Sequence, residues 1–202
     1  TPGENAQRYF AKYNKQKRTF EALTELIQET ADDIQYLESI SNALDIALSE
    51  ADLAQIKEEL MQSGYIRRKH TKKKVKLTSK PMHYISSDGY DMYVGKNNLQ
   101  NEELTFSFAN GNDWWFHAKG APGSHVIVKS GGDELPDRTF EEAGRLAAYY
   151  SKNRGADKVE IDYIQKKHVK KPNGAKPGFV VYYTNYSLVI DSDISNIKNV
   201  QD

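Results

Sequence analysis

Apolar residues in the first 64 positions recur at the spacing of a helix. No glycine or proline interrupts the chain between Gly3 and Gly64. The pattern predicts a long helix over 3–48 and a short second helix over 52–62, with Gly64 as its C-terminal cap. Seven side chains of the long helix fall on the a and d positions of a heptad repeat, which is typical of a coiled coil. They are Tyr13, Phe20, Leu23, Ile27, Ile34, Leu37 and Leu44.

This heptad seam requires a partner surface. The second helix is much shorter than the seam and covers only one end of it. We therefore expect the rest to pack on another chain or on sequence outside this one, and the isolated fragment to form a homodimer through residues 10–48. The alternative is that the long helix lies across a globular domain, as most amphipathic helices do.

From residue 81 onward, short apolar runs alternate with turn residues. HYISS and YDMYVG flank the turn SSDG and predict a hairpin. Strands outnumber helices, so the sequence predicts the α+β class, with a long helical coiled-coil arm followed by a mixed β-sheet domain with flanking helices. The other strands are expected at 113–118, 124–130, 158–169, 178–183 and 187–191.

Two helices are predicted within this domain. The first covers 96–109. The second covers 138–153, where Thr139 is the expected N-cap and Glu142 completes a capping box. The candidate buried positions are Leu99, Leu104 and Phe108 in the first helix and Ala143, Leu146, Ala147 and Tyr150 in the second.

Composition narrows the class of protein. Hydrophobic residues make up 38% and charged residues 28% of 202 positions, which is typical of a globular protein with a polar extension. The absence of cysteine excludes disulfides and thiolate metal sites. No apolar run approaches the roughly 20 residues of a membrane span. The start at TPGEN, without methionine, indicates a fragment.

Charge is unevenly distributed although the formal net charge is zero. Residues 1–64 carry 6 basic and 12 acidic side chains, whereas residues 65–80 carry 8 basic and none acidic. The chain thus divides into a helical arm over 1–64, a basic linker over 65–80 and a sheet domain over 81–202. Such a cationic run attracts nucleic-acid phosphates, and it is also typical of a solvated linker.

The stretch DWWFHAKGAPGSHVIV holds both tryptophans and two of the five histidines. The eight-residue spacing of His117 and His125 matches no common zinc pattern, and no third ligand stands out. Ser124 with a neighbouring histidine would suit a hydrolase, yet no nucleophile elbow accompanies it. Trp115 and Phe116 are expected to anchor the sheet. We therefore predict no metal, no cofactor and no catalytic site.

Nucleic-acid binding accounts for more of the sequence. The lysines of YIQKKHVKK add a second basic segment to the 65–80 run, and the loop VGKNN with the following LQN offers amide donors and acceptors. Lysine and arginine contact phosphates, whereas aromatic and imidazole rings stack on unpaired bases. A basic run beside a second basic segment and an asparagine-rich loop favours RNA binding more strongly than a lysine run alone.

Several segments resemble the NFACT family over nearly the whole chain. They are NAQRYFAKYNK, YLESI, QIKEELMQSGYI, VGKNNLQNEELTF, DWWFHAKGAPGSHVIV, EAGRLAAYYSKNRG and HVKKPNGAKPGFVVYY. The order of the motifs is similar to the end of the family's coiled-coil middle domain followed by its NFACT-R domain, an RNA-binding module. The resemblance implies that the family's amino-terminal domains, and a helix that would pair with the seam, lie outside this sequence.

The resemblance also implies a function in ribosome quality control. Such a protein binds large ribosomal subunits that hold a stalled peptidyl-tRNA, contacts rRNA and tRNA, and supports untemplated alanine tailing of the nascent chain. It is not an enzyme, needs no cofactor or membrane, and works on ribosomes in the cytoplasm. The alternative is a fibronectin-binding surface adhesin, because some members carry that name. No signal peptide, wall anchor or repeat is visible, which argues against dedicated secretion.

We expect VGKNN and the HAKGAPGSH turn to lie side by side as one exposed RNA-facing patch, because binding residues concentrate in polar loops between strands. Alanine at Asn97 or His125 is then expected to weaken RNA binding and to leave thermal stability nearly intact. The predicted RNA-binding residues are Arg67, Arg68, Lys72, Lys73, Lys74, Lys96, Asn97, Asn98, Asn101, His117, Lys119, Ser124, His125, Lys129, Lys167, His168, Lys170 and Lys171.

Overall fold

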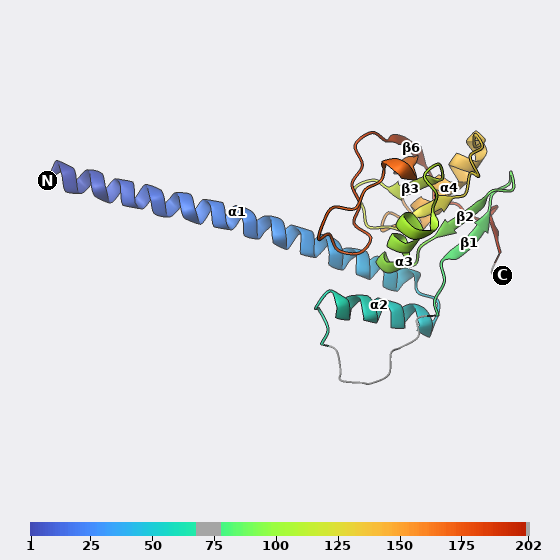
Figure 1. Cartoon of the computed structure of the whole chain (residues 1–202), viewed down its shortest axis with the longest axis horizontal. Coiled ribbons are helices and arrows are strands. Elements are labelled where there is room, and N and C mark those ends of the chain that lie inside the picture. Colours follow the sequence, from blue (N-terminus) through green and yellow to red (C-terminus); the bar gives the residue numbers. More distant parts are fainter. Residues whose placement is uncertain (68–77, 201–202) are drawn as a thin grey trace. The chain divides into compact units, whose positions relative to one another are not determined.

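The protein divides into two compact units, Thr1–Leu37 and Glu38–Asp202, and helix α1 (Pro2–Ile46) runs through the boundary between them (Figure 1). A computed structural model describes residues 1–67 and 78–200. None of the helices in these two ranges combines the length and the apolar character that a membrane span requires.

The long first helix is confirmed. The hydroxyl of Thr1 accepts a hydrogen bond from the backbone N–H of Glu4 at 3.3 Å, and Glu4 places a negative charge in the first turn. The seven side chains of the heptad seam are exposed, with exposed fractions between 42% and 71%. The helix therefore carries an apolar stripe that is exposed to solvent in this chain.

The second helix, α2 (Glu50–Gln62), is also confirmed, and it begins two residues earlier than expected. Ser49 and Asp52 form a reciprocal capping box at its start, which satisfies two backbone N–H groups. Gly64 follows its end with φ of 82°, a left-handed conformation that glycine adopts without steric cost.

A seven-stranded sheet forms the centre of the second unit, in the order β6-β5-β3-β4-β2-β1-β7. All six pairings are antiparallel. The strands are β1 (Met82–Ile85), β2 (Asp91–Val94), β3 (Trp114–Ala118), β4 (Val126–Val128), β5 (Val159–Gln165), β6 (Tyr186–Ile190) and β7 (Lys198–Asn199).

The α+β class is confirmed, whereas the expectation of a mixed sheet is wrong. Turns or loops join β1 to β2, β3 to β4 and β5 to β6, and each of these pairs is antiparallel. The connection through helix α4 (Asp137–Tyr149) leads from β4 to β5, which point the same way. Because β3 lies between them, no parallel pairing results.

Layers cover both faces of the sheet. On one face α4 packs its Ala143, Leu146 and Ala147 against a core that includes Phe116. On the other face Trp115 packs with the π-helical turn Leu104–Phe108, into which helix α3 (Asn98–Glu103) leads, and with the segment that follows β5. Trp115 and Phe116 are both 0% exposed, which confirms that this aromatic pair anchors the two cores.

Three local predictions are corrected. Helix α4 begins at Asp137 behind Pro136, so Thr139 is not its N-cap and instead donates its hydroxyl to Asp88 at 2.8 Å. Phe108 was expected to be buried, but the π-helical turn leaves it 41% exposed. The segment 178–183 forms only an isolated bridge, from Val181 to Lys170.

Candidate nucleic-acid interface

A basic segment begins where β5 ends. A single 3-10 turn, Lys166–His168, leads out of the strand, and Lys170 then exchanges two backbone hydrogen bonds with Val181, of 3.0 and 2.9 Å. This bridge holds 170–181 as one closed loop. No acidic residue occurs between Asp162 and Asp191, a span that contains five lysines. The local charge is therefore positive without internal compensation.

Exposed aromatic rings accompany these lysines. Phe179, Tyr183 and Tyr186 have exposed fractions of 48%, 82% and 62%. Single-stranded nucleic acids bind to surfaces of this kind, because exposed aromatic rings stack on the bases and neighbouring cations contact the phosphates. We call Lys166, Lys167, His168, Lys170, Lys171, Lys176, Phe179 and Tyr183 the basic-aromatic strip.

The lysines of the strip differ in their local partners. Lys171 binds both carboxylate oxygens of Glu102 at 2.7 Å, and Lys176 lies 5.3 Å from the ring centroid of Tyr65. Lys167 and Lys170 are exposed and have no acidic partner among residues 1–67 and 78–200. The charges of these two lysines are therefore exposed and uncompensated, as a phosphate contact requires.

Two other predicted lysines are held in ion pairs. Lys129 binds Asp113, whose carboxylate is nearly fully buried, and also donates to the backbone carbonyl of Phe108 at 3.3 Å. Lys119 pairs with Glu160 at 2.5 Å on the adjacent strand. Both charges are locally compensated, so neither residue adds to the uncompensated charge of the strip.

The asparagine-rich loop does not form the expected exposed patch. Asn97 and Asn98 are only 2% and 7% exposed, because α2 packs over them. Asn97 caps α3 by accepting from the backbone N–H of Gln100 at 3.0 Å, and its amide donates to Gln55 at 2.9 Å. Asn98 donates to Ser39 at 2.7 Å. The loop is thus a polar joint between helices.

Lys96 belongs to the same joint. Its Nζ lies 3.3 Å from Oδ1 of the buried Asp52, and the hydroxyl of Ser79 donates to that oxygen as well. Gln100 donates to Ser79 at 2.7 Å and so links this group to Asn97. Lys96 is thus held in an ion pair at the start of α2.

Gly95 of VGKNN lies beside His125 of the HAKGAPGSH turn, and Asn101 contacts His125 as well, but these contacts are in the interior. Oδ1 of Asn101 accepts from the backbone N–H of His125 at 3.0 Å, and the backbone N–H of Gly95 donates to the carbonyl of His125 at 3.1 Å. Ser124 and His125 are each 2% exposed. Both side chains are therefore withdrawn from solvent, and Asn101 of α3 lies against this segment through its hydrogen bonds to Gly123 and His125.

The two histidines of the turn belong to an uncharged aromatic cluster. The rings of His117 and His125 lie 5.6 and 5.1 Å from that of Trp115. Nδ1 of His125 pairs with Thr105 Oγ1 at 2.8 Å. Burial lowers the pKa of His117 to about 4 and lowers the pKa of His125 well below its usual value, with His117 adding to the second effect. Neither ring supplies a cation at neutral pH.

The metal and hydrolase alternatives gain no geometric support. In the part of the chain that the structure describes, no three acidic or imidazole side chains gather as a metal site would require. His125 pairs with Thr105 rather than with Ser124, so this histidine is not oriented as a base toward the serine.

The basic linker lies mostly outside the described residues. Arg68, Lys72, Lys73 and Lys74 fall in 68–77, and Arg67, just before this range, is exposed. The sequence analysis missed the exposed rings of the strip. Their signal was present, since FVVYYTNY follows the lysines without an intervening acid.

Comparisons with known proteins agree over the whole chain. Residues 1–79 match the NFACT N-terminal and middle domains, and residues 80–184 match the NFACT protein RNA binding domain. The Rqc2 homolog RqcH of Streptococcus pneumoniae is 45% identical over 202 residues, and that of Bacillus subtilis is 41% identical. The Streptococcus pneumoniae match includes all of this chain and 36% of that relative, and the Bacillus subtilis match includes 98% of this chain and 35% of that relative.

A solved structure has the same fold. The C-terminal part of the fibronectin/fibrinogen-binding protein from Streptococcus suis superposes with a TM-score of 0.88 at 43% sequence identity, covering 98% of this chain and 80% of that one. The chain therefore belongs to the NFACT family and contains its RNA-binding domain.

Proposed function

We propose that this chain is an RNA-contacting part of a ribosome quality control factor. The observation that carries the proposal is the position of the strip, since the acid-free lysines and exposed rings lie almost entirely within residues 80–184, the range that matches the RNA binding domain. The relatives that share the full length of the chain are Rqc2 homologs, which supports the ribosome as the place of action.

Within the strip, Lys167 and Lys170 contact phosphates, and Tyr183 with Phe179 stacks on unpaired bases. Of the residues predicted from sequence, His168 and Lys171 join this surface. Arg67, Arg68, Lys72, Lys73 and Lys74 are proposed as further phosphate contacts. The buried Asn97, Asn98, Asn101, Ser124 and His125 act only by holding the surface in shape.

This chain spans about a third of the length of its relatives. The whole protein is proposed to bind stalled large ribosomal subunits and tRNA and to support alanine tailing. In this scheme the chain contributes affinity for rRNA or tRNA. Phosphate contacts position RNA without reading its sequence, so the strip supplies attachment and leaves specificity to other parts.

The test compares lysines that differ only in place. Binding of single-stranded RNA is measured by fluorescence anisotropy over a salt series, with the double variant Lys167→Gln/Lys170→Gln. The slope of log affinity against log salt is expected to fall by about 0.7 for each phosphate that the variant no longer binds. Lys158→Gln removes an exposed lysine at the opposite end of β5 and serves as control. An unchanged slope in the double variant would show that Lys167 and Lys170 do not contact phosphates, and would reject the strip as the RNA-binding surface.

Base stacking has its own test. Tyr183→Ala is expected to weaken binding by about 1–3 kcal/mol, because one base loses its stacking platform. Tyr9→Ala removes a similarly exposed ring from α1, where no RNA contact is proposed, and is expected to change nothing. Equal losses in both variants would mean that the ring of Tyr183 has no special role.

Fibronectin binding is the second candidate, favoured by the name of the Streptococcus suis protein with the same fold. Co-sedimentation with large subunits from stalled ribosomes is compared with binding to immobilised fibronectin. The proposal requires that the chain pellets with the subunits and that the double lysine variant reduces this. Saturable fibronectin binding without subunit binding would decide for the adhesin.

A further inference from the structure

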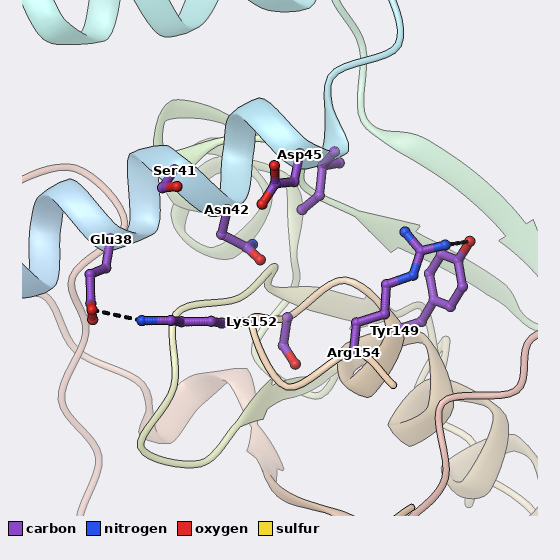
Figure 2. A pocket seen from close by; sticks show the side chains of 9 residues that line it. Glu38, Ser41, Asn42, Asp45, Tyr149, Lys152 and Arg154 are labelled. Atoms are coloured by element: carbon purple, nitrogen blue, oxygen red, sulfur yellow. Dashed lines mark hydrogen bonds and ion pairs between the residues drawn. The ribbon is translucent and has the colours of Figure 1, made fainter. Parts of the chain in front are cut away.

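A cavity of about 420 Å³ lies between the last turns of α1 and the segment that follows α4 (Figure 2). Asn42 and Asp45 reach into it from the helix, and Tyr149, Lys152 and Arg154 border the other side. This volume is within the range of small-ligand sites. None of the residues that line the cavity belongs to the basic-aromatic strip.

Backbone hydrogen bonds hold the wall formed by 150–154. The N–H of Lys152 donates to the carbonyl of Pro122 at 2.9 Å, and Ser151 forms a bridge with Gly123. Asn42 donates its amide to the carbonyl of Tyr150 at 3.4 Å and so ties the helix to this wall. A ligand would meet a largely preformed site, which lowers the entropic cost of binding.

A planar platform stands on one side of the cavity. The guanidinium carbon of Arg154 lies 3.7 Å from the ring centroid of Tyr149, and the guanidinium also hydrogen-bonds the Tyr149 hydroxyl. Tyrosine does not neutralise the charge of Arg154. The outer face of a guanidinium held in this way is a surface on which a nucleobase stacks.

The opposite wall offers hydrogen-bond acceptors. Because Asn42 donates its amide nitrogen to a carbonyl, its Oδ1 remains as an acceptor. No described residue pairs with the Asp45 carboxylate, which lies in the last turn of α1. Negative charge is unfavourable at that end of a helix dipole, and side chains that break such a rule are common at functional sites.

We propose that this cavity binds an unpaired guanine nucleotide of RNA, an inference that rests on the proposed RNA-binding function. Guanine carries two adjacent donors, N1–H and N2–H, which match the two oxygens of Asp45. Its ring stacks on Arg154, and its phosphate faces Lys152, whose Nζ pairs with Glu38 at 2.6 Å at the edge of the cavity and would exchange that partner for the phosphate. Adenine lacks the paired donors. An arginine side chain of a protein partner has the donors, but the charge of Arg154, which no carboxylate of the described residues pairs with, would repel it.

The test measures anisotropy with an oligoadenylate and with the same oligomer bearing one central guanosine. The guanosine oligomer is expected to bind about tenfold more tightly. Asp45→Asn, which replaces one acceptor by a donor, is expected to remove this preference and to leave the affinity for oligoadenylate unchanged. Asp133→Asn, at an exposed acid outside the cavity, is the control and keeps the preference.

Equal affinity for the two oligomers, or a preference that survives Asp45→Asn, overturns the inference while RNA binding itself stands. If neither oligomer binds, the proposed function fails, and calorimetry with guanosine 5′-monophosphate and adenosine 5′-monophosphate decides about the cavity. Binding of the guanosine nucleotide that Asp45→Asn abolishes upholds the site, and absence of such binding rejects it.

Discussion

The side-chain amide of Asn97 donates to Oε1 of Gln55 at 2.9 Å, and both residues are almost completely buried. Gln55 lies on α2 and Asn97 caps α3, so this contact joins two helices that are 42 positions apart in the chain. A buried amide pair of this kind is costly to break from one side, because the remaining partner keeps its desolvation penalty. The asparagine-rich motif therefore fixes architecture.

Asn97→Ala is expected to lower the free energy of unfolding by about 2–3 kcal/mol. About 1 kcal/mol comes from removal of the helix cap, and the rest from the amide contact with Gln55. Urea denaturation measures the change. Asn196→Ala, at an exposed asparagine of the same unit, is the control and is expected to be neutral. If Asn97→Ala proves as stable as the control, the joint contributes nothing and the exposed-patch interpretation regains support.

Gly95→Ala is expected to destabilise the same region by a different route. A Cβ at this position would lie 2.2 Å from Oδ1 and 3.0 Å from the backbone nitrogen of Asn101. The side chain of Asn101 would have to release the N–H of His125, which costs about 2–4 kcal/mol with the overpacking included.

Gly111→Ala is the matched control for that substitution. Its added Cβ would meet the Cβ of Lys167 at 3.6 Å, an ordinary contact. The melting temperatures of the two variants are compared by thermal unfolding. Equal melting temperatures would show that Asn101 can move without cost.

The regular elements could be predicted because their signals are local. The long helix follows from an uninterrupted 3.6-residue pattern, and the β1–β2 hairpin from a glycine turn between two short apolar runs. Trp115 and Phe116 were expected in the core, and both are. Each of these inferences depends on neighbours along the chain rather than on a distant partner.

The candidate site was harder to predict because amides and imidazoles suit both a wet surface and a buried network. Only Gln55, on another helix, decides that Asn97 is interior. His125 gave a better clue, since strand alternation places it on the same face as the buried Ile127. We expected that face to meet solvent, but Leu104 of the π-helical turn and Val169 of the segment after β5 pack against it.

Acid is expected to destabilise the protein through His117 and His125. The folded pKa of His117 is lowered from 6.5 to about 4, and that of His125 is lowered well below 6.5, so the unfolded chain binds more protons than the folded protein once the pH falls below about 6.5. Stability is then constant above about pH 7 and falls as pH drops through 6.5 toward 4, by at most about 1.4 kcal/mol per pH unit for each histidine.

Urea denaturation across this pH range measures the slope. His125→Gln is expected to reduce the slope by about half, whatever its effect on stability at neutral pH. His168→Gln removes an exposed histidine and is expected to leave the slope unchanged. Identical slopes in the parent protein and His125→Gln would mean that carboxylates, not this histidine, control acid unfolding.

The heptad seam on α1 is expected to bring two copies of the chain together. Its side chains are exposed, Ile27 by 68%, and each gains about 1.5–3 kcal/mol when fully buried. Light scattering over a concentration series is expected to show a dimer, and Ile27→Asp is expected to give a monomer whose sheet domain remains folded, because the new charge cannot be buried without a partner. Ala22→Asp places the same charge off the seam, at an exposed position of the same helix, and is expected to remain dimeric. A parent chain that stays monomeric at high concentration, with the full helix content by circular dichroism, would show that α1 is stable with its apolar stripe in water and would remove the case for self-association.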